Sequence, residues 1–137
     1  MGSLSIKNLQ ISFKSETDFT DAVKGISFDI KPGEIVGLVG ESGSGKSVTS
    51  LAIMRLLESN ARLKGHVLLD GMDLLQISEK QMEDIRGNKI GMIFQEPMTS
   101  LNPVITCGKQ VSETIVRHQK TTKQEAKQKT IALFNEV

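Results

Sequence analysis

The first thirty residues alternate between apolar and polar positions. This pattern predicts one extended segment over residues 6–13 and a second over residues 23–30. The alternation is strict over residues 26–30, so the second strand should bury one of its two faces. Residues 31–33 read Lys-Pro-Gly, which predicts a turn because proline presets φ and glycine tolerates positive φ.

The hydrophobic period changes after this turn. Residues 34–39 are apolar on both faces, as expected for a central strand that is buried between parallel neighbours. Residues 48–57 are apolar nearly all round a helix, and such a helix should be buried. Farther along, residues 60–65 predict a loop, and residues 66–70 and 89–94 predict two short strands.

Three more helices are predicted in the rest of the chain. Residues 78–81 and 122–125 each have the spacing of a capping box, which starts a helix. An apolar stripe over residues 107–118 predicts the helix between them. The last helix has no stop signal, and its apolar stripe is still running at Val137. We therefore expect the chain to have been cut inside a larger domain.

Composition and charge exclude several classes of protein. Seventeen lysines and arginines nearly balance sixteen aspartates and glutamates, so a net charge of +1 supplies no global field for nucleic acid or anionic lipid. Residues 120–129 hold four lysines and one glutamate, which indicates a solvated helix face. A single cysteine, Cys107, allows neither an internal disulfide nor a cysteine metal site, and it favours a reducing compartment.

The candidate chemistry lies in a glycine-rich loop. Residues 40–47 fit the pattern G-x-x-x-x-G-K-[ST] and stand between the predicted buried strand and the predicted buried helix. Glycines let successive N–H groups turn toward phosphate oxygens, and a helix that starts at Gly45 or Lys46 adds the positive end of its dipole. Lys46 supplies a charge for the β- and γ-phosphates, and the Ser47 hydroxyl is a ligand for Mg²⁺. The predicted phosphate-binding set is Gly40, Glu41, Ser42, Gly43, Ser44, Gly45, Lys46, Ser47, Val48 and Thr49.

Three longer stretches carry a family resemblance. They are GISFDIKPGEIVGLVGESGSGKSVTSLAIMRLL, GHVLLDGMDLL and IGMIFQEPMTSLNP, and they resemble the ATP-binding subunit of an ABC importer of the oligopeptide, dipeptide and nickel group. The resemblance extends over residues 4–137. It implies an α/β fold of the P-loop NTPase class, with an antiparallel β subdomain, part of a parallel core sheet and the start of a helical subdomain. Residues 1–106 would form the nucleotide-binding core, and residues 107–137 would begin the helical subdomain.

The resemblance also implies roles for particular residues. Gln95 matches the glutamine that meets Mg²⁺ or the attacking water and has a catalytic role beside Lys46. Phe13 matches an aromatic that stacks on adenine, with Phe19 as its rival. The loop over residues 96–103 would face the membrane-spanning permease subunits, and a second ATP-binding subunit would complete the site. ATP and Mg²⁺ are the implied cofactors, and the cytoplasmic face of the membrane is the implied location.

Parts of the family machinery are not found in this sequence. No L-S-G-G-Q string, no hydrophobic run ending in Asp-Glu and no switch histidine occurs, and the resemblance places all three after Val137. The strands that flank the loop strand would also come from there. We expect this chain by itself to bind ATP weakly and to hydrolyse it negligibly.

Two other interpretations stay open. Asp70 ends a strand-like HVLLD run and would serve Mg²⁺ in a small P-loop kinase or GTPase, although Gly71 follows it where a glutamate is needed and no N-K-x-D string is present. The chain could instead be a non-catalytic module that binds nucleotide or docks on a membrane subunit. The sequence does not distinguish peptide from nickel as the cargo, and His66 and His118 favour structural roles.

Overall fold

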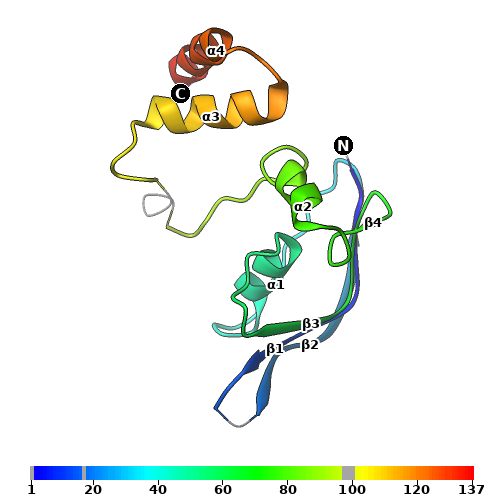
Figure 1. Cartoon of the computed structure of the whole chain (residues 1–137). Coiled ribbons are helices and arrows are strands. Elements are labelled where there is room, and N and C mark those ends of the chain that lie inside the picture. Colours follow the sequence, from blue (N-terminus) through cyan, green and yellow to red (C-terminus); the bar gives the residue numbers. More distant parts are fainter. Residues whose placement is uncertain (1, 17, 97–100) are drawn as a thin grey trace. The chain divides into compact units, whose positions relative to one another are not determined.

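The computed structural model describes residues 2–16, 18–96 and 101–137. It contains two compact units, Met1–Met82 and Glu83–Val137, drawn in Figure 1. The predicted division after residue 106 does not coincide with this one. The division after residue 106 comes from the position of the helical subdomain in the family that the sequence resembles, and it stays a prediction.

The first unit is built on a four-stranded antiparallel sheet. Its strands are β1 (Leu4–Lys14), β2 (Phe19–Ile30), β3 (Ala61–Leu69) and β4 (Met72–Asp73), in the order β2-β1-β3-β4. The two predicted N-terminal strands are confirmed. The loop predicted over residues 60–65 is wrong for residues 61–65, which belong to the first half of β3 beside β1; Asn60 lies in the turn before this strand.

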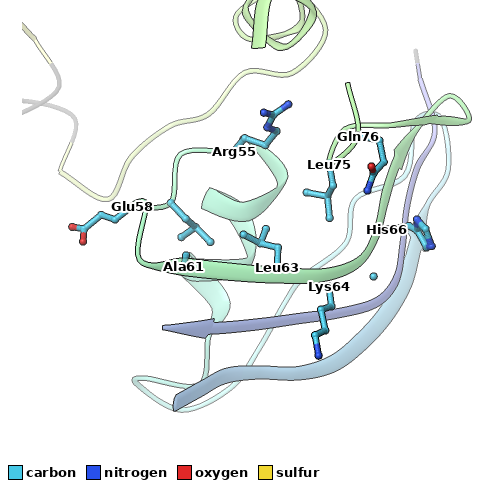
Figure 2. A pocket seen from close by; sticks show the side chains of 10 residues that line it. Arg55, Glu58, Ala61, Leu63, Lys64, His66, Leu75 and Gln76 are labelled. Atoms are coloured by element: carbon cyan, nitrogen blue, oxygen red, sulfur yellow. The ribbon is translucent and has the colours of Figure 1, made fainter. Parts of the chain in front are cut away.

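The strand register sorts the side chains onto two faces. Ile11 pairs with Val23 on β2 and with Leu63 on β3, and its side chain is completely buried. Figure 2 shows Leu63 on the side of the sheet that faces α1 (Lys46–Ile53) and Lys64 on the opposite side. We call the α1 side the inner face and the other side the outer face. The buried apolar residues of this unit are Ile6, Leu9, Ile11, Val23, Ala52, Met54, Val67, Leu74 and Met82.

A bulge bends the sheet near its middle. Asn8 has a φ of 48°, and both partner strands place a glycine nearby, Gly25 and Gly65, each with a φ of 94°. The register of β1 shifts here against both neighbours, which keeps Leu9 on the inner face. A Cβ on Gly65 would collide with Asn8 O and lie 2.6 Å from Lys7 O, so the close approach of the backbones requires glycine.

Two predicted strands are wrong. Residues 34–39 and 89–94 form no strand, and only an isolated parallel bridge joins Arg86 to Ile90. Ile35 is 98% exposed and Ile93 is 92% exposed. A strand needs a hydrogen-bonded neighbour for its N–H and C=O groups, and neither stretch pairs with a strand of the described sheet. Within residues 2–16, 18–96 and 101–137, the predicted parallel part of the core sheet is therefore not formed.

The helix after the glycine loop is shorter and less buried than predicted. It ends at Ile53, and only Thr49 and Ala52 within it are buried. The apolar residues of this helix were expected to pack against partners on all sides. They are partly exposed because, as for residues 34–39, the described chain does not supply enough neighbouring elements to cover them.

The second unit contains a pair of packed helices, α3 (Cys107–Gln119) and α4 (Lys123–Asn135). They run antiparallel, since a Cβ on Gly108 would lie 3.8 Å from the Phe134 ring near the far end of α4. Ile115, Ala126 and Thr130 are buried between them. Both predicted helices are confirmed, and the described residues contain no helix long and apolar enough to cross a bilayer.

Both predicted capping boxes are present. Ser78 precedes α2 (Glu79–Ile85) and exchanges hydrogen bonds with Gln81. Thr122 precedes α4 and does the same with Glu125. The Glu125 carboxylate accepts hydrogen bonds from the Thr121 hydroxyl and from the N–H and hydroxyl of Thr122. These bonds, the one from Thr121 most strongly, lower the pKa of Glu125 to about 2.

Candidate phosphate-binding site

Gly45 holds the glycine loop against the sheet at the start of α1. It caps the helix with φ 89° and ψ 6°, and the helix begins at Lys46 as predicted. A Cβ on Gly45 would lie 2.8 Å from Ala22 O and 2.8 Å from Val23 Cγ2, so a larger residue does not fit. Gly43 also has a positive φ, 79°, but a Cβ there would meet nothing within 4 Å, so this side of the loop is open.

Consecutive N–H groups at the helix start are available to a ligand. In the part of the chain that the structure describes, the N–H groups of Gly45, Lys46, Ser47 and Val48 have no hydrogen-bond acceptor. The first N–H groups of a helix have no partner within it, and together with the helix dipole they favour an anion. This is the donor arrangement that a phosphate group requires.

The Lys46 ammonium lies within the same loop. Its Nζ donates to Gly40 O at 2.8 Å, to Glu41 O at 2.6 Å and to Ser44 Oγ at 3.3 Å. All of these acceptors are uncharged, and no carboxylate in the described part of the chain pairs with the ammonium. A polyphosphate that replaces one of them gains a full positive charge next to the free N–H groups.

The residues after the lysine divide between the surface and the core. Ser47 is exposed, which leaves its hydroxyl open to a metal ion. Thr49 is only 2% exposed, and both its N–H and its hydroxyl donate to Gly45 O, at 2.9 and 2.8 Å. Thr49 therefore fixes the first turn of α1 to the loop. Thr49 also lines one of the two cavities beside the loop, and its contact with phosphate stays a prediction, as does that of the Val48 N–H.

Two cavities adjoin the loop. One of about 120 Å³ is lined by residues 43–48 and is surrounded by the free N–H groups. The other, about 190 Å³, shares Ser44, Gly45 and Lys46 with it and continues over Val23 and Ile26 on the inner face of the sheet. The first cavity suits phosphate groups because N–H donors line it. The second suits an apolar group because Val23 and Ile26 form part of its wall.

A larger cavity of about 620 Å³ lies elsewhere in the first unit, beside β3 (Figure 2). It shares no lining residue with the loop cavities. The Arg55 guanidinium at its border donates to the carbonyls of Leu74 and Ile77 and pairs with Glu79 at 3.3 Å. This arginine ties the end of α1 to the segment after β4, and we give it a structural role.

The register separates the two phenylalanines proposed to stack on a base. Phe13 pairs with Ala61, two residues beyond the pair formed by Ile11 and Leu63, so it lies on the inner face. Gly45 packs against this same side of the sheet, through Val23. Phe19 pairs with Lys14 and lies on the outer face, where the Arg62 guanidinium sits 3.8 Å from its ring centroid. Of the two, only Phe13 shares a face with the loop.

Gln95 belongs to the second unit and is exposed, after a stretch that is not a strand. The predicted permease-facing loop over residues 96–103 lies partly outside the described residues, which resume at residue 101. The roles of Gln95 and of this loop stay predictions.

Asp70 is used within the sheet. Its Oδ1 accepts a hydrogen bond from Ser3 N at 2.7 Å, at the turn between β3 and β4.

Nearby, burial raises the pKa of Asp73, but the hydrogen bonds from His66, Leu75 N and Val67 N outweigh it, and the net pKa is lowered. No group of three acidic, histidine or cysteine residues in the described ranges is placed to hold a metal ion.

Comparison with known proteins agrees with the loop geometry. Residues 23–137 match the family model described as "ABC transporter". The oligopeptide transport ATP-binding protein OppD of Bacillus subtilis is 47% identical over 133 residues, 96% of this chain and 37% of the relative. The dipeptide transport ATP-binding protein DppD of Escherichia coli is 46% identical over 138 residues, 100% of this chain and 42% of the relative. The chain thus spans about two fifths of the length of these relatives.

A solved structure has the same fold. The ATP-binding cassette MJ0796, a dimer bound to ADP and Pi in a post-hydrolysis state, superimposes with a TM-score of 0.78 at 26% identity. The alignment covers 94% of this chain and 54% of the cassette. Together with the family match and the loop, these similarities show that the chain belongs to the ABC transporter family and is similar to the ATP-binding subunits of oligopeptide and dipeptide transporters.

Proposed function

We propose that this chain binds ATP with Mg²⁺ through the glycine loop, as part of an ATPase that powers peptide import. The four free N–H groups at the start of α1, with the Lys46 ammonium beside them, are the observation that carries the proposal. The names of the relatives support peptides as the cargo class. Nickel is supported only by the family resemblance.

In the proposed complex, the β-phosphate accepts hydrogen bonds from the N–H groups of residues 45–48. Lys46 then exchanges part of its bonding to Gly40 O and Glu41 O for oxygens of the β- and γ-phosphates. Glu41, Ser42 and Ser44 contribute the backbone that encloses the tail. Because the ammonium forms no ion pair with any described residue, its positive charge is available to offset the charge that develops as the terminal phosphate leaves.

Ser47 is the residue of the described site whose chemistry fits Mg²⁺. Its hydroxyl is exposed one residue after the lysine, and hydroxyl oxygen is a suitable ligand for this hard cation. When bound, Mg²⁺ would offset part of the negative charge of the phosphates. Gln95 is proposed to orient the attacking water, or to meet the metal, through its amide oxygen.

The proposed base site is the apolar cavity that continues from the loop over the inner face. Phe13 lies on this face and offers a ring for stacking, which is worth about 1–3 kcal/mol per base. This placement favours Phe13 over Phe19, whose ring is already covered by a guanidinium.

The transport role needs partners beyond this chain. We propose that a second ATP-binding subunit and the permease subunits complete the assembly at the cytoplasmic face of the membrane. The dimeric cassette with the same fold supports the first of these, and the printed names of the relatives support the second. For the 137 residues alone, we propose nucleotide binding with negligible hydrolysis, since the sequence contains no Asp-Glu run and no L-S-G-G-Q string.

Binding of a fluorescent ATP analogue to the purified chain tests this proposal. Replacing Lys46 with alanine removes the hydrogen bonds of a charged donor and should weaken binding by roughly 10- to 100-fold. Lys31→Ala is the matched control, because it removes the same charge from an exposed turn outside the loop. AMP, which lacks the phosphates that Lys46 would contact, should compete equally well against wild type and Lys46→Ala.

The outcomes separate the alternatives. Equal loss in both lysine variants would place the polyphosphate elsewhere. Rapid turnover of ATP by the wild-type chain, abolished by Lys46→Ala, would refute the expected inactivity and favour a self-contained small NTPase. If Asp70→Asn also abolished such turnover, the kinase or GTPase interpretation would replace ours, although Asp70 accepts a hydrogen bond from Ser3 N here.

A further inference from the structure

The outer face of the sheet gathers basic residues that are far apart in the sequence. The register places Lys24, Gln10 and Lys64 in one row across β2, β1 and β3. The next row toward the β1–β2 turn contains Arg62, and the row after it contains Lys14. On the other side of the bulge, Lys7 pairs with His66. We call Lys7, Lys14, Lys24, Arg62 and Lys64 the basic face.

All five side chains of the basic face point away from the core. Each of these residues is exposed, whereas the alternate positions, such as Ile11 and Leu63, lie on the inner face. Figure 2 shows Lys64 extending to the side of β3 opposite Ala61 and Leu63. The bulge at Asn8 inserts one extra residue into β1. It thereby keeps Leu9 on the inner face and leaves Lys7, before the bulge, and Lys64, beside Gln10 after it, on the outer face.

The charge on this face is not neutralised. Among the described residues, none of the five cations makes an ion pair, and the Arg62 guanidinium lies over the ring of Phe19. Asp21 is the one carboxylate in the same rows, and it accepts a hydrogen bond from the Ser12 hydroxyl at 2.9 Å. In the rows from Lys7 to Lys14, five cations and one carboxylate leave four positive charges. Acidic residues border these rows at both ends: Glu16 and Asp18 lie in the turn after Lys14, and Asp29 and Asp73 lie one row beyond Lys7, where Asp73 is paired with His66.

The spacing of these charges gives a continuous positive field. Neighbouring strands are about 4.8 Å apart, so Lys24 and Lys64 lie about 10 Å from each other across β1. This is close to the Debye length at physiological ionic strength, about 8–10 Å, so the fields of neighbouring cations overlap. The chain as a whole carries a net charge of only +1, so carboxylates elsewhere in the sequence balance these cations.

We propose that the basic face docks on the surface of a lipid bilayer that contains anionic headgroups. The cations stand on long, flexible stems, in rows over three strands, with no fixed partner. That arrangement suits a surface on which the negative charges are themselves mobile. The exposed part of Phe19, at the edge of the face, adds an apolar ring of the kind that interfacial segments bury between headgroups. A bilayer is available if the chain works at a transporter, as proposed above, but the docking needs no nucleotide.

Co-sedimentation with vesicles tests the proposal. The purified 137-residue chain should bind phosphatidylcholine vesicles that contain phosphatidylserine, bind pure phosphatidylcholine vesicles far less, and dissociate at high salt. A triple variant, Lys14→Gln/Lys24→Gln/Lys64→Gln, should weaken binding on the order of a hundredfold, because each basic residue near such a surface is worth about fivefold. These lysines are exposed and unpaired, so circular dichroism should show an unchanged fold.

The matched control makes the same change of net charge elsewhere. Lys120→Gln/Lys123→Gln/Lys127→Gln removes three exposed lysines from the second unit, in the stretch with the highest lysine density in the sequence. This variant should bind like wild type. An equal loss in both triple variants would show that only net charge matters and would overturn the proposal.

Two further results would also overturn it. One is binding to poly-glutamate without binding to anionic vesicles, which would indicate an acidic protein partner. The other is vesicle binding that the first triple variant leaves intact. Because no step uses ATP, Lys46→Ala should bind vesicles normally, which keeps this test independent of the proposed nucleotide site.

Discussion

Gly45 is the position at which a single methyl group should damage the site most. Its φ of 89° is strained for any other residue, and its Cα faces the backbone of β2. In Gly45→Ala, the new Cβ would lie 2.8 Å from Ala22 O and 2.8 Å from Val23 Cγ2. Contacts under 3.0 Å with a backbone carbonyl require the start of α1 to move away from the sheet.

The cost has two parts. Left-handed backbone costs an L-residue roughly 1–2 kcal/mol, and overpacking adds typically 1–3 kcal/mol. We therefore expect Gly45→Ala to lower the free energy of unfolding by about 2–5 kcal/mol. Gly33→Ala is the matched control, since Gly33 has a φ of 79° but a Cβ there would meet nothing within 4 Å. It should cost only the backbone strain.

Urea unfolding followed by circular dichroism measures both variants, because the chain has no tryptophan to report by fluorescence. ATP-analogue binding should be lost in Gly45→Ala under conditions where the protein is still folded, since displacement of α1 removes the aligned N–H groups. Equal destabilisation by the two alanines would show that the contact with β2 is unimportant, and our account of how the loop is held would be wrong.

Three other perturbations have definite expected results. Gly65→Ala should destabilise the first unit by about 2–5 kcal/mol in urea titrations, since it meets two backbone carbonyls, and Gly71→Ala should cost only strain. Phe13→Ala should weaken ATP binding roughly 5- to 150-fold in fluorescence titrations, and Phe19→Ala should not. The pKa of Glu125 is lowered to about 2 from an ordinary 4.5, so its contribution to stability is complete above pH 4.5 and lost as the pH falls toward 2. Thermal melts from pH 6 to pH 2 should therefore show the stability difference between wild type and Glu125→Gln shrinking on acidification; a difference independent of pH would contradict this reasoning.

The glycine loop and the helix starts could be predicted from the sequence because each depends on a few adjacent residues. The loop pattern around Lys46 and the capping boxes at Ser78 and Thr122 require no distant partner, and each is present in the structure. Thr49 shows the limit of this reasoning. Motif spacing predicts that it lies near the phosphates, but its burial and the hydrogen bond from its hydroxyl to Gly45 O depend on how α1 packs.

The sequence by itself determined the local chemistry of the protein: a helix start with free N–H groups, a lysine and a hydroxyl in fixed order, and the family to which that order belongs. Only the tertiary structure decided which residues share a face. Residues 34–39 have the composition of a buried strand but remain exposed, because strand hydrogen bonds need a neighbour that composition does not provide. The basic face likewise joins lysines from three strands, and a shift of one residue in register would turn them toward the core.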